Sequence, residues 1–458
     1  MVSVHIGFDD SDEFVWGCTT NLVREFVKEI SLSSIARKIR FIDYPLLTRL
    51  NPAIPYKTRG NGATSIHIEV ETAYDYIVKE LEDIIIQKID EGKKNSGRDP
   101  GALILVGDLS IDIARYIYRK TLSDYVTRDI ADRIIMKIGG ITPARGRGVI
   151  GALASIAHHF IEGDCTYELL GYTLDSEWEG VEREKVYEMD RKTWPYTFNN
   201  IDRESDKILI TPSVGRPVSI GIRGENPRIL LKAFEILQPR GVDEIMIFRS
   251  NQGTDHHMIY RDLRDVRPYQ TGLFEGVLAE DPEISVGGDV FLRLIKSSEE
   301  SEDKAILVAV YKELGEGNMI VRNLRRGDKI LVGGSVKPMP SIDRSHDIIV
   351  NVELLKVVEM TSIYIERNPR CPRCGHTMKS MGRDKGYKCP RCGYIDKKIR
   401  KSFLEVGRDK SIIGKIYRPP PRYMKHLSKP PQRYGLEKIC SRRTLSRINI
   451  DQFYRRIA

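Results

Sequence analysis

The sequence lacks the features that mark several large classes of protein. In its 458 residues no apolar run approaches the ~20 residues of a membrane-spanning helix, so we expect no membrane partner. The first residues, MVSVHIGFDDSD, have neither a basic start nor a long apolar stretch, which argues against a secretory signal and for a cytoplasmic protein. The sequence also has no internal repeat and no long low-complexity segment. It lacks the Walker pattern G-x4-G-K-[ST], and this absence excludes a standard P-loop enzyme.

Cysteine is scarce and unevenly placed. The chain has 7 cysteines, and four of them crowd into 22 residues near the C-terminus: Cys371, Cys374, Cys389 and Cys392. The remaining three are scattered along the chain: Cys18, Cys165 and Cys440. Such scattering does not predict a disulfide framework.

The net charge of +9 hides an acidic front and a basic rear. Residues 361–458 hold 26 Lys and Arg against 7 Asp and Glu, a net charge of +19. The first 360 residues hold 47 against 57, a net charge of −10. A basic tail on an acidic body predicts a polyanion bound chiefly by the tail. The alternative is a basic extension that is merely solvated.

The sequence pattern differs between the front and the rear of the chain. Up to about residue 260, strand-like and helix-like patterns alternate, which favours an α+β or α/β catalytic body of more than one domain. After Arg267 five short strand candidates follow within about 90 residues, separated by Gly- and Asp-rich turns and with no good helix between them. Five strands in this length predict a small β-barrel, with an oligonucleotide-binding (OB) fold as the obvious candidate. A barrel without a ligand remains the alternative.

The most specific motif is CPRCGHTMKSMGRDKGYKCPRCG. It contains two C-x2-C pairs separated by fourteen residues, each followed by glycine. Such pairs place four thiolates around one ion with no open position, so they predict a structural zinc ribbon. Seven Lys or Arg lie between Arg370 and Arg391 inclusive, and we expect this ribbon, including Arg373 and Arg391, to face phosphates.

The segment IYRPPPRYMKHLSKPPQRYG interleaves cations with Tyr, His and Pro. Such a segment can contact phosphates while its aromatic rings stack on unpaired bases. We take its RNA-binding candidates to be Arg418, Arg422, Lys425 and His426. A Pro-rich segment that packs on the protein's own surface is nearly as good an interpretation.

An acidic loop follows the first predicted strand. Asp9, Asp10 and Asp12 precede Thr19, which lies at the start of a predicted helix. Clustered carboxylates suit magnesium, and a helix N-terminus suits a phosphate, so the loop is a candidate nucleotide site. An ordinary turn, with Thr19 as an ordinary N-cap, is the alternative.

Two glycine-rich loops could hold phosphates, since glycine lets the backbone approach an anion and neighbouring cations neutralise it. The candidates in KTRGNG and ARGRG are Lys57, Arg59, Gly60, Asn61, Gly62, Arg147 and Gly148. A third polar cluster, FRSNQGTDHH, follows a predicted strand and supplies the candidate substrate-binding residues Asn251, Gln252 and Asp255. Each loop alone could equally be a structural turn.

These motifs in this order resemble the archaeal tRNA-isoleucine 2-agmatinylcytidine synthetases. The resemblance rests on IGFDDSD…GCTT, NPAIPYKTRGNGA, RDPGAL, ARGRGVIGALA, TFNNID, GIRGE, FRSNQGTDHH, the four-cysteine ribbon and RPPPRYMKHLSKP, and covers about residues 1–435. It implies a kinase-like α/β domain and a ferredoxin-like domain, followed by an OB-fold barrel and a zinc ribbon. Ser11 and Ser250 depart from the family pattern, which has threonine at both positions.

The resemblance also implies an activity. Agmatine would be joined to carbon 2 of the wobble cytidine in the CAU anticodon of tRNA-isoleucine, so that the modified base reads AUA codons. ATP would be split to AMP and pyrophosphate, with phosphorylation of the cytidine 2-oxygen and of a threonine of the enzyme, here Thr19. ATP, magnesium and a structural zinc are the expected cofactors. No obligate protein partner is evident.

The expected domain limits follow from the motifs and from the resemblance together. We predict a kinase-like region at 1–195, the rest of the catalytic body with the ferredoxin-like domain at 196–265, the barrel at 266–360, the ribbon at 361–400 and a basic extension at 401–458, and we leave open whether the first two interleave. The competing functional hypothesis is a non-catalytic protein that binds single-stranded nucleic acid through its barrel and ribbon. It leaves the acidic loop and the glycine-rich loops without a role.

Overall fold

The computed structural model describes residues 1–11, 17–57, 60–71, 74–93, 99–212, 217–297, 299, 305–339, 348–442 and 448–457. Two candidate site residues, Asp12 and Arg59, lie outside the described residues. Among the described residues no helix is long and apolar enough to cross a membrane.

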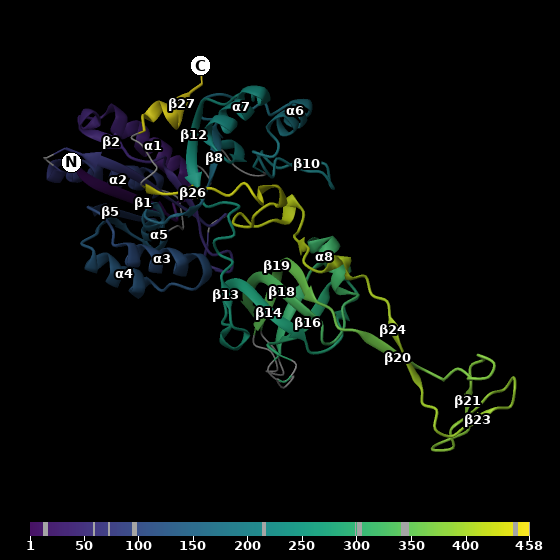
Figure 1. Cartoon of the computed structure of the whole chain (residues 1–458). Coiled ribbons are helices and arrows are strands. Elements are labelled where there is room, and N and C mark those ends of the chain that lie inside the picture. Colours follow the sequence, from purple (N-terminus) through teal and green to yellow (C-terminus); the bar gives the residue numbers. More distant parts are fainter. Residues whose placement is uncertain are drawn as a thin grey trace.

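One continuous sheet forms the front body (Figure 1). Its strands are β1 (Val2–Asp9), β2 (Ile39–Phe41), β3 (Leu46–Arg49), β4 (Gly62–Val70), β5 (Gly101–Val106), β6 (Ile141–Arg145), β8 (Thr166–Tyr172), β11 (Val218–Gly224), β12 (Glu244–Ser250) and β27 (Tyr454–Arg456). The order is β11-β8-β12-β3-β4-β1-β5-β6, with β2 on β4 and β27 on β12. Parallel pairing of β12 with β3 joins the two halves, where Arg249 lies opposite Leu46.

Helices cover the sheet, most of them amphipathic, whereas α5 is buried on nearly all sides. They are α1 (Thr19–Leu32), α2 (Tyr74–Lys93), α3 (Ile111–Ser123), α4 (Arg128–Lys137), α5 (Val149–His159), α6 (Arg183–Thr193) and α7 (Pro227–Leu237). In α1, Leu22, Phe26 and Ile30 recur every four residues and are fully buried, as expected for one apolar helix face. Successive side chains of strand β5 point to opposite faces of the sheet. Ile104 packs in the core with α1 and α2, and Leu103 packs with α3, α4 and α5 on the other face.

The rear contains the predicted barrel. Its strands are β14 (Thr271–Leu278), β16 (Val290–Ile295), β17 (Ile306–Val310), β18 (Lys329–Pro338) and β19 (Ile348–Glu359). Pairing of β14 with β16 closes the five strands, since Val277 lies opposite Ile295. All five strands were predicted, and the expected multidomain α+β fold with its barrel is confirmed. The short helix α8 (Glu316–Val321) was not predicted, because six residues give too little periodicity to read.

The zinc ribbon lies at the end of a two-stranded stalk, away from the barrel and the front body (Figure 1). The stalk pairs β20 (Ile363–Arg367) with β24 (Ser402–Val406). The ribbon itself consists of β21 (Lys379–Ser380), β22 (Tyr387–Lys388) and β23 (Ile395–Asp396).

The chain then returns to the body. We call residues 411–457 the strap, of which 443–447 lie outside the described residues. It adds β25 (Ile416–Tyr417) to β19 of the barrel, β26 (Ile439–Cys440) to β7 (Gly163–Asp164), and β27 to β12. Phe453 of the strap is 1% exposed in the core of the front body. The strap is therefore a structural part of the body as well as a basic segment.

Pairing of β26 with β7 overturns one expectation. Cys165 and Cys440, expected to be outside any disulfide framework, form a disulfide across a separation of 275 residues. No local spacing could reveal this pair, because only the return of the strap brings the two thiols together. Cys18 remains free.

Candidate active site

A cavity of about 370 Å³ brings together residues from three separate motifs. The acidic loop supplies Asp9 and Asp10, the KTRGNG loop supplies Lys57 and Asn61, and the ARGRG loop supplies Arg147 and Gly148. The rest of the lining comes from Leu50, Ile54, Tyr56, Thr121, Asp124, Tyr125, Val126, Ile150 and Gly151. The cavity thus contains much of the site that was expected from the sequence.

The two carboxylates lie where β1 meets the N-terminus of α5. Asp10 has a positive φ of 56°, and its N–H donates to Oδ1 of Asp9 at 2.7 Å. The helix can come this close because two positions in ARGRGVIGALA lack a side chain. A Cβ on Gly151 would lie 1.9 Å from Oδ2 of Asp9, and one on Gly148 would lie 2.3 Å from its carbonyl oxygen. Glycine is therefore a packing requirement here.

Arg147 lies between Asp10 of the acidic loop and Asp99, at the edge of the cavity. Its guanidinium lies 3.6 Å from Oδ2 of Asp10 and 3.9 Å from Oδ2 of Asp99, while its backbone N–H donates to Asp99 at 2.8 Å. The side chain is 58% exposed, so the guanidinium can also face an incoming anion. The N-terminal end of the α5 dipole adds a partial positive charge beside it.

Lys57 provides the cation on the opposite loop. Its ammonium group donates to the Pro52 carbonyl at 2.7 Å. Burial, followed by the nearby ammonium groups of Lys337 and Lys425, lowers the pKa of Lys57 to about 8. An anion bound here would favour the protonated form and raise that pKa again.

The cavity has an apolar wall and a charged rim. Leu50, Ile54, Val126 and Ile150 form apolar lining, whereas carboxylates, ammonium and guanidinium groups line the remainder. This combination suits a nucleotide, whose base needs an apolar surface and whose phosphates need cations and backbone N–H groups.

Sequence reasoning missed the segment between α3 and α4. Thr121, Asp124 and Tyr125 line the cavity, yet no motif marks them. Oδ2 of Asp124 lies 3.6 Å from the guanidinium of Arg261. The only available signal was a short polar stretch between two helical patterns, which is also what an ordinary loop looks like.

Thr19 lies at the start of α1 and close to the acidic loop. Its hydroxyl accepts a hydrogen bond from Oγ of Ser11 at 3.2 Å, and the residue is 2% exposed. The N-cap of the helix is Cys18, so the interpretation of Thr19 as an N-cap is wrong. The proposed acceptor hydroxyl is thus next to the acidic loop but covered.

The polar cluster after β12 lies beside the KTRGNG loop and is largely buried. Oε1 of Gln252 accepts from Arg49 at 3.1 Å, and Oδ1 of Asn251 accepts from the Arg49 backbone at 2.7 Å. Arg49 in turn donates to the Gly60 carbonyl at 3.3 Å. Asn251 and Gln252 therefore position this loop through Arg49. Asp255 is ion-paired with Arg418 of the strap.

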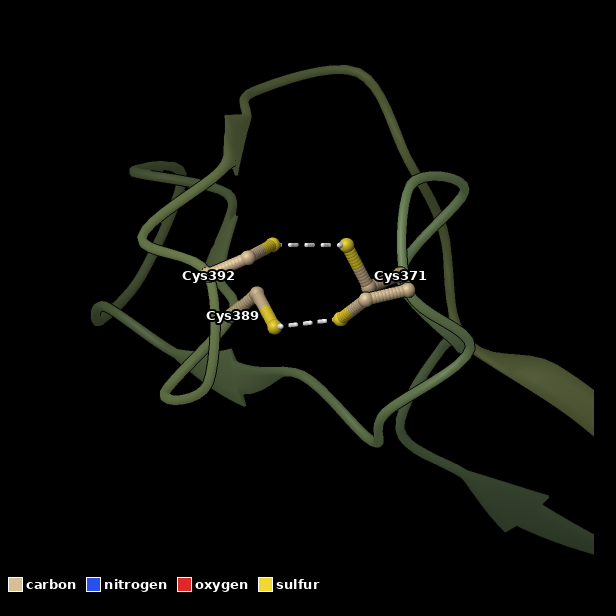
Figure 2. Close-up of side chains that lie close together, drawn as sticks. Cys371, Cys389 and Cys392 are labelled. Carbon is tan, nitrogen blue, oxygen red and sulfur yellow. Dashed lines mark hydrogen bonds between the residues drawn. The ribbon is translucent and has the colours of Figure 1, made fainter.

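The four ribbon cysteines converge as their spacing predicted (Figure 2). Sγ of Cys371 lies 3.5 Å from that of Cys392, and Sγ of Cys374 lies 3.4 Å from that of Cys389. The two knuckles match: Gly375 N–H donates to the Cys371 carbonyl at 2.9 Å, and Gly393 N–H to that of Cys389 at 3.0 Å. Four sulfurs within 4.8 Å of one another fit a tetrahedral thiolate site for zinc.

The RNA-binding candidates fall into two groups. In the ribbon, Arg373 and Arg391 belong to a set of seven cations, none of which pairs with a carboxylate in the described part of the chain. In the strap, Arg418 pairs with Asp255, and Arg422 pairs with Asp202 and Glu204.

His426 and Lys425 lie in the same part of the strap. The charge of Arg49, followed by burial, holds the pKa of His426 well below its usual value, so its ring is neutral at neutral pH. Lys425 is exposed. The strap therefore offers less free charge than its composition suggests.

Comparison with protein families agrees with this arrangement. Residues 5–141 match the family model described as the TiaS TCKD domain, residues 146–257 match the TiaS FLD domain, and residues 368–409 match the TiaS C-terminal zinc ribbon domain. The three matches cover both halves of the front sheet and the ribbon.

Similar proteins extend the match to nearly the whole chain. The tRNA 2-agmatinylcytidine synthetase TiaS of Ignisphaera aggregans is 36% identical over 96% of this chain and 94% of its own. Among solved structures, the complex of TiaS with its isoleucine tRNA and ATP is 31% identical with a TM-score of 0.76. The complex of TiaS with the same tRNA, AMPCPP and agmatine is 30% identical with a TM-score of 0.73. Each covers 94% of this chain and 97% of the solved one.

Proposed function

The chain belongs to the TiaS family of tRNA 2-agmatinylcytidine synthetases, and we propose that its cavity of about 370 Å³ is where ATP drives the joining of agmatine to the wobble cytidine of tRNA-isoleucine. The observation that carries this assignment is the convergence of the acidic loop and two cationic glycine loops on one cavity. A protein that only binds nucleic acid needs neither these carboxylates nor a nucleotide-sized hollow. The non-catalytic alternative is accordingly disfavoured.

The chemistry needs an activated oxygen. An amine cannot displace the 2-oxygen of cytosine directly, because oxide is a very poor leaving group. Transfer of a phosphoryl group from ATP to that oxygen turns it into part of a phosphate, which leaves when the agmatine amine attacks carbon 2. Such a transfer depends on positioning and charge neutralisation. One such transfer leaves ADP, so the cleavage of ATP to AMP and pyrophosphate is a separate step, which stays a prediction for this chain.

We assign the phosphates to the cationic rim. Lys57 and Arg147 neutralise phosphate oxygens, and the loops that contain Gly60, Asn61, Gly62 and Gly148 let the backbone approach them closely. Asp9 and Asp10, with Asp12 from outside the described residues, would hold magnesium, which neutralises phosphate charge and orients the oxygens when bound. The fit of Asp9 against the bare Cα of Gly151 leaves both carboxylates beside the cavity.

Thr19 is proposed as the phosphate acceptor of the enzyme itself. Its hydroxyl lies near the acidic loop, although it is 2% exposed and bonded to Ser11. Phosphorylation would therefore require the hydrogen bond from Ser11 to Thr19 to break. We propose that the polar cluster acts on substrate mainly by holding Arg49 and the strap in place, through Asn251, Gln252 and Asp255.

A tRNA substrate and a zinc ribbon are in keeping with a cytoplasmic enzyme.

Asp10→Asn is the sharpest test of the cavity. The variant keeps the size of the side chain but loses the charge that would hold magnesium, so we expect agmatidine formation to fall by at least about 100-fold, as when electrostatic stabilisation of a transferred phosphoryl group is removed. Binding of tRNA and the melting temperature should not change. Mass spectrometry of tRNA nucleosides, after incubation with ATP and agmatine, measures the product.

The matched control is Asp112→Asn, an exposed position on α3 that lies outside the cavity lining. It removes the same charge and should leave product formation unchanged. Wild-type turnover by the Asp10→Asn variant would remove the acidic loop from the mechanism.

A further inference from the structure

Three lysines from three distant parts of the chain converge beside the cavity. Lys57 comes from the loop after β3, Lys337 from the barrel strand β18, and Lys425 from the strap. Lys57 donates to the Pro52 carbonyl at 2.7 Å, and Lys337 donates to the adjacent Ala53 carbonyl at 2.6 Å. Two ammonium groups are thus held at neighbouring carbonyls of one loop. We call these three residues the lysine cluster.

The cluster is electrostatically unfavourable as it stands. Burial, followed by the charge of Lys425, lowers the pKa of Lys337, and both Lys337 and Lys425 act in the same direction on Lys57. Like charges gathered at the junction of barrel, loop and strap cost free energy unless an anion joins them.

No protein carboxylate forms an ion pair with the cluster. Across the described ranges, none of the three ammonium groups lies within ion-pair distance of an Asp or Glu side chain. The carboxylate of Glu353 raises the pKa of Lys57 and Lys337 through its charge, and this residue is 5% exposed. Its carboxylate already accepts hydrogen bonds from Ser335 at 2.7 Å and Ser428 at 3.1 Å. Among the described residues no carboxylate therefore neutralises the cluster, and an anion from outside the protein would match it.

We propose that the lysine cluster binds one phosphodiester group of the tRNA anticodon loop and so holds the wobble nucleotide at the mouth of the cavity. Lys57 lines that cavity and belongs to the cluster, so a backbone phosphate on the cluster would leave its base beside the carboxylates. The barrel and the strap each supply one lysine, whereas the phosphates of ATP need only the loops of the front body. This assignment rests on the proposed function and adds the positioning residues Lys337 and Lys425.

Lys337→Met tests the cluster without touching the cavity lining. The variant keeps the length of the side chain and loses its charge. We expect an isolated anticodon stem-loop of tRNA-isoleucine to bind about 10-fold more weakly at low salt, with the slope of log affinity against log salt smaller by about 1, the change expected for one lost phosphate contact. Lys337→Arg should restore most of the affinity. Affinity for ATP, measured without RNA, should not change.

Lys329→Met is the matched control, because Lys329 lies on the same strand but pairs with Glu275 at 2.6 Å. It should leave the affinity and the salt slope unchanged. Unchanged stem-loop binding by Lys337→Met would overturn the proposal, and so would a loss of ATP affinity, which would assign the anion to the nucleotide.

Failure of the cluster and failure of the proposed function can be told apart. If wild-type protein forms agmatidine while Lys337→Met binds the stem-loop normally, only the cluster assignment fails. If wild-type protein forms no agmatidine, the proposed function fails whatever the binding data show.

Discussion

The ribbon with its stalk and the strap are consecutive basic segments, but they use their charge in opposite ways. Residues 361–410 hold 14 Lys and Arg against 5 Asp and Glu, and residues 411–458 hold 12 against 2, so their net charges of +9 and +10 are nearly equal. The ribbon extends away from the body (Figure 1). The strap runs back along the barrel and ends within the front sheet.

The difference lies in what surrounds each cation. In the strap, Arg433 is fully buried, with Asp164 at 3.0 Å and a second carboxylate from Glu225. Arg418, Arg422 and Lys429 also pair with acidic residues of the body. The acidic front is therefore partly neutralised by its own strap. Net charge alone would have predicted equal RNA attraction for both segments, whereas in the described residues the strap pairs more of its cations with carboxylates than the ribbon does.

Removing the strap should have the largest effect. Ending the chain at Gly414 deletes β25, β26, β27 and Phe453 from the barrel and the sheet. We expect the product to lose its cooperative thermal transition, because exposed sheet edges and an open core remain. Circular dichroism melts would show this.

Excising the ribbon is the contrasting experiment. Replacing residues 364–405 by a short Gly-Ser turn joins Ile363 to Val406, which lie opposite each other in the stalk. The excision removes 12 Lys and Arg against 4 Asp and Glu. We expect an unchanged melting temperature, loss of zinc, and tRNA affinity lower by about 10-fold or more with a flatter salt dependence. Equal tRNA binding by the excised protein would contradict the division of labour.

Two single substitutions, one of an arginine in the strap and one of an arginine in the ribbon, test the same difference between the two segments. Arg433→Ala leaves two carboxylates, on Asp164 and Glu225, without their buried partner, so we expect a loss of about 3–5 kcal/mol in the free energy of unfolding. Arg391→Ala, on the ribbon, should leave stability unchanged and reduce the salt slope of tRNA binding by about 1. Urea titrations and binding at several salt concentrations distinguish the two. A stability loss in Arg391→Ala, or none in Arg433→Ala, would reverse the assignment.

The disulfide gives the smallest expected change. Cys440→Ser opens a covalent loop of 275 residues between strap and body, so we expect the free energy of unfolding to fall by about 2–4 kcal/mol. Adding a reductant to the wild-type protein should cause the same shift. Cys18→Ser, which removes a thiol outside the disulfide, is the control. If oxidised wild type and Cys440→Ser unfold at the same denaturant concentration, the bond does not secure the strap.

Several features could be predicted from the sequence because their physics is local. Two C-x2-C pairs with following glycines define a thiolate site whatever surrounds them, and short strand-like segments between Gly- and Asp-rich turns marked all five barrel strands. The glycine and carboxylate motifs likewise marked Asp9, Lys57 and Arg147 individually as candidates. Their roles in catalysis and the predicted domain limits stay predictions.

What the sequence could not determine depends on which segments meet in three dimensions. Tyr125 and Asp124 join the cavity only because α3 ends beside α5 and the loop after β3. Nothing in the sequence pairs Arg433 with Asp164 or Cys440 with Cys165, and both pairs form where β26 binds β7. A charge or thiol has no fixed role along the chain, since its free energy depends on burial and on the partner brought near by folding. For this protein, local spacing determined the kinds of site, and the return of the strap decided which basic side chains pair with carboxylates of the body.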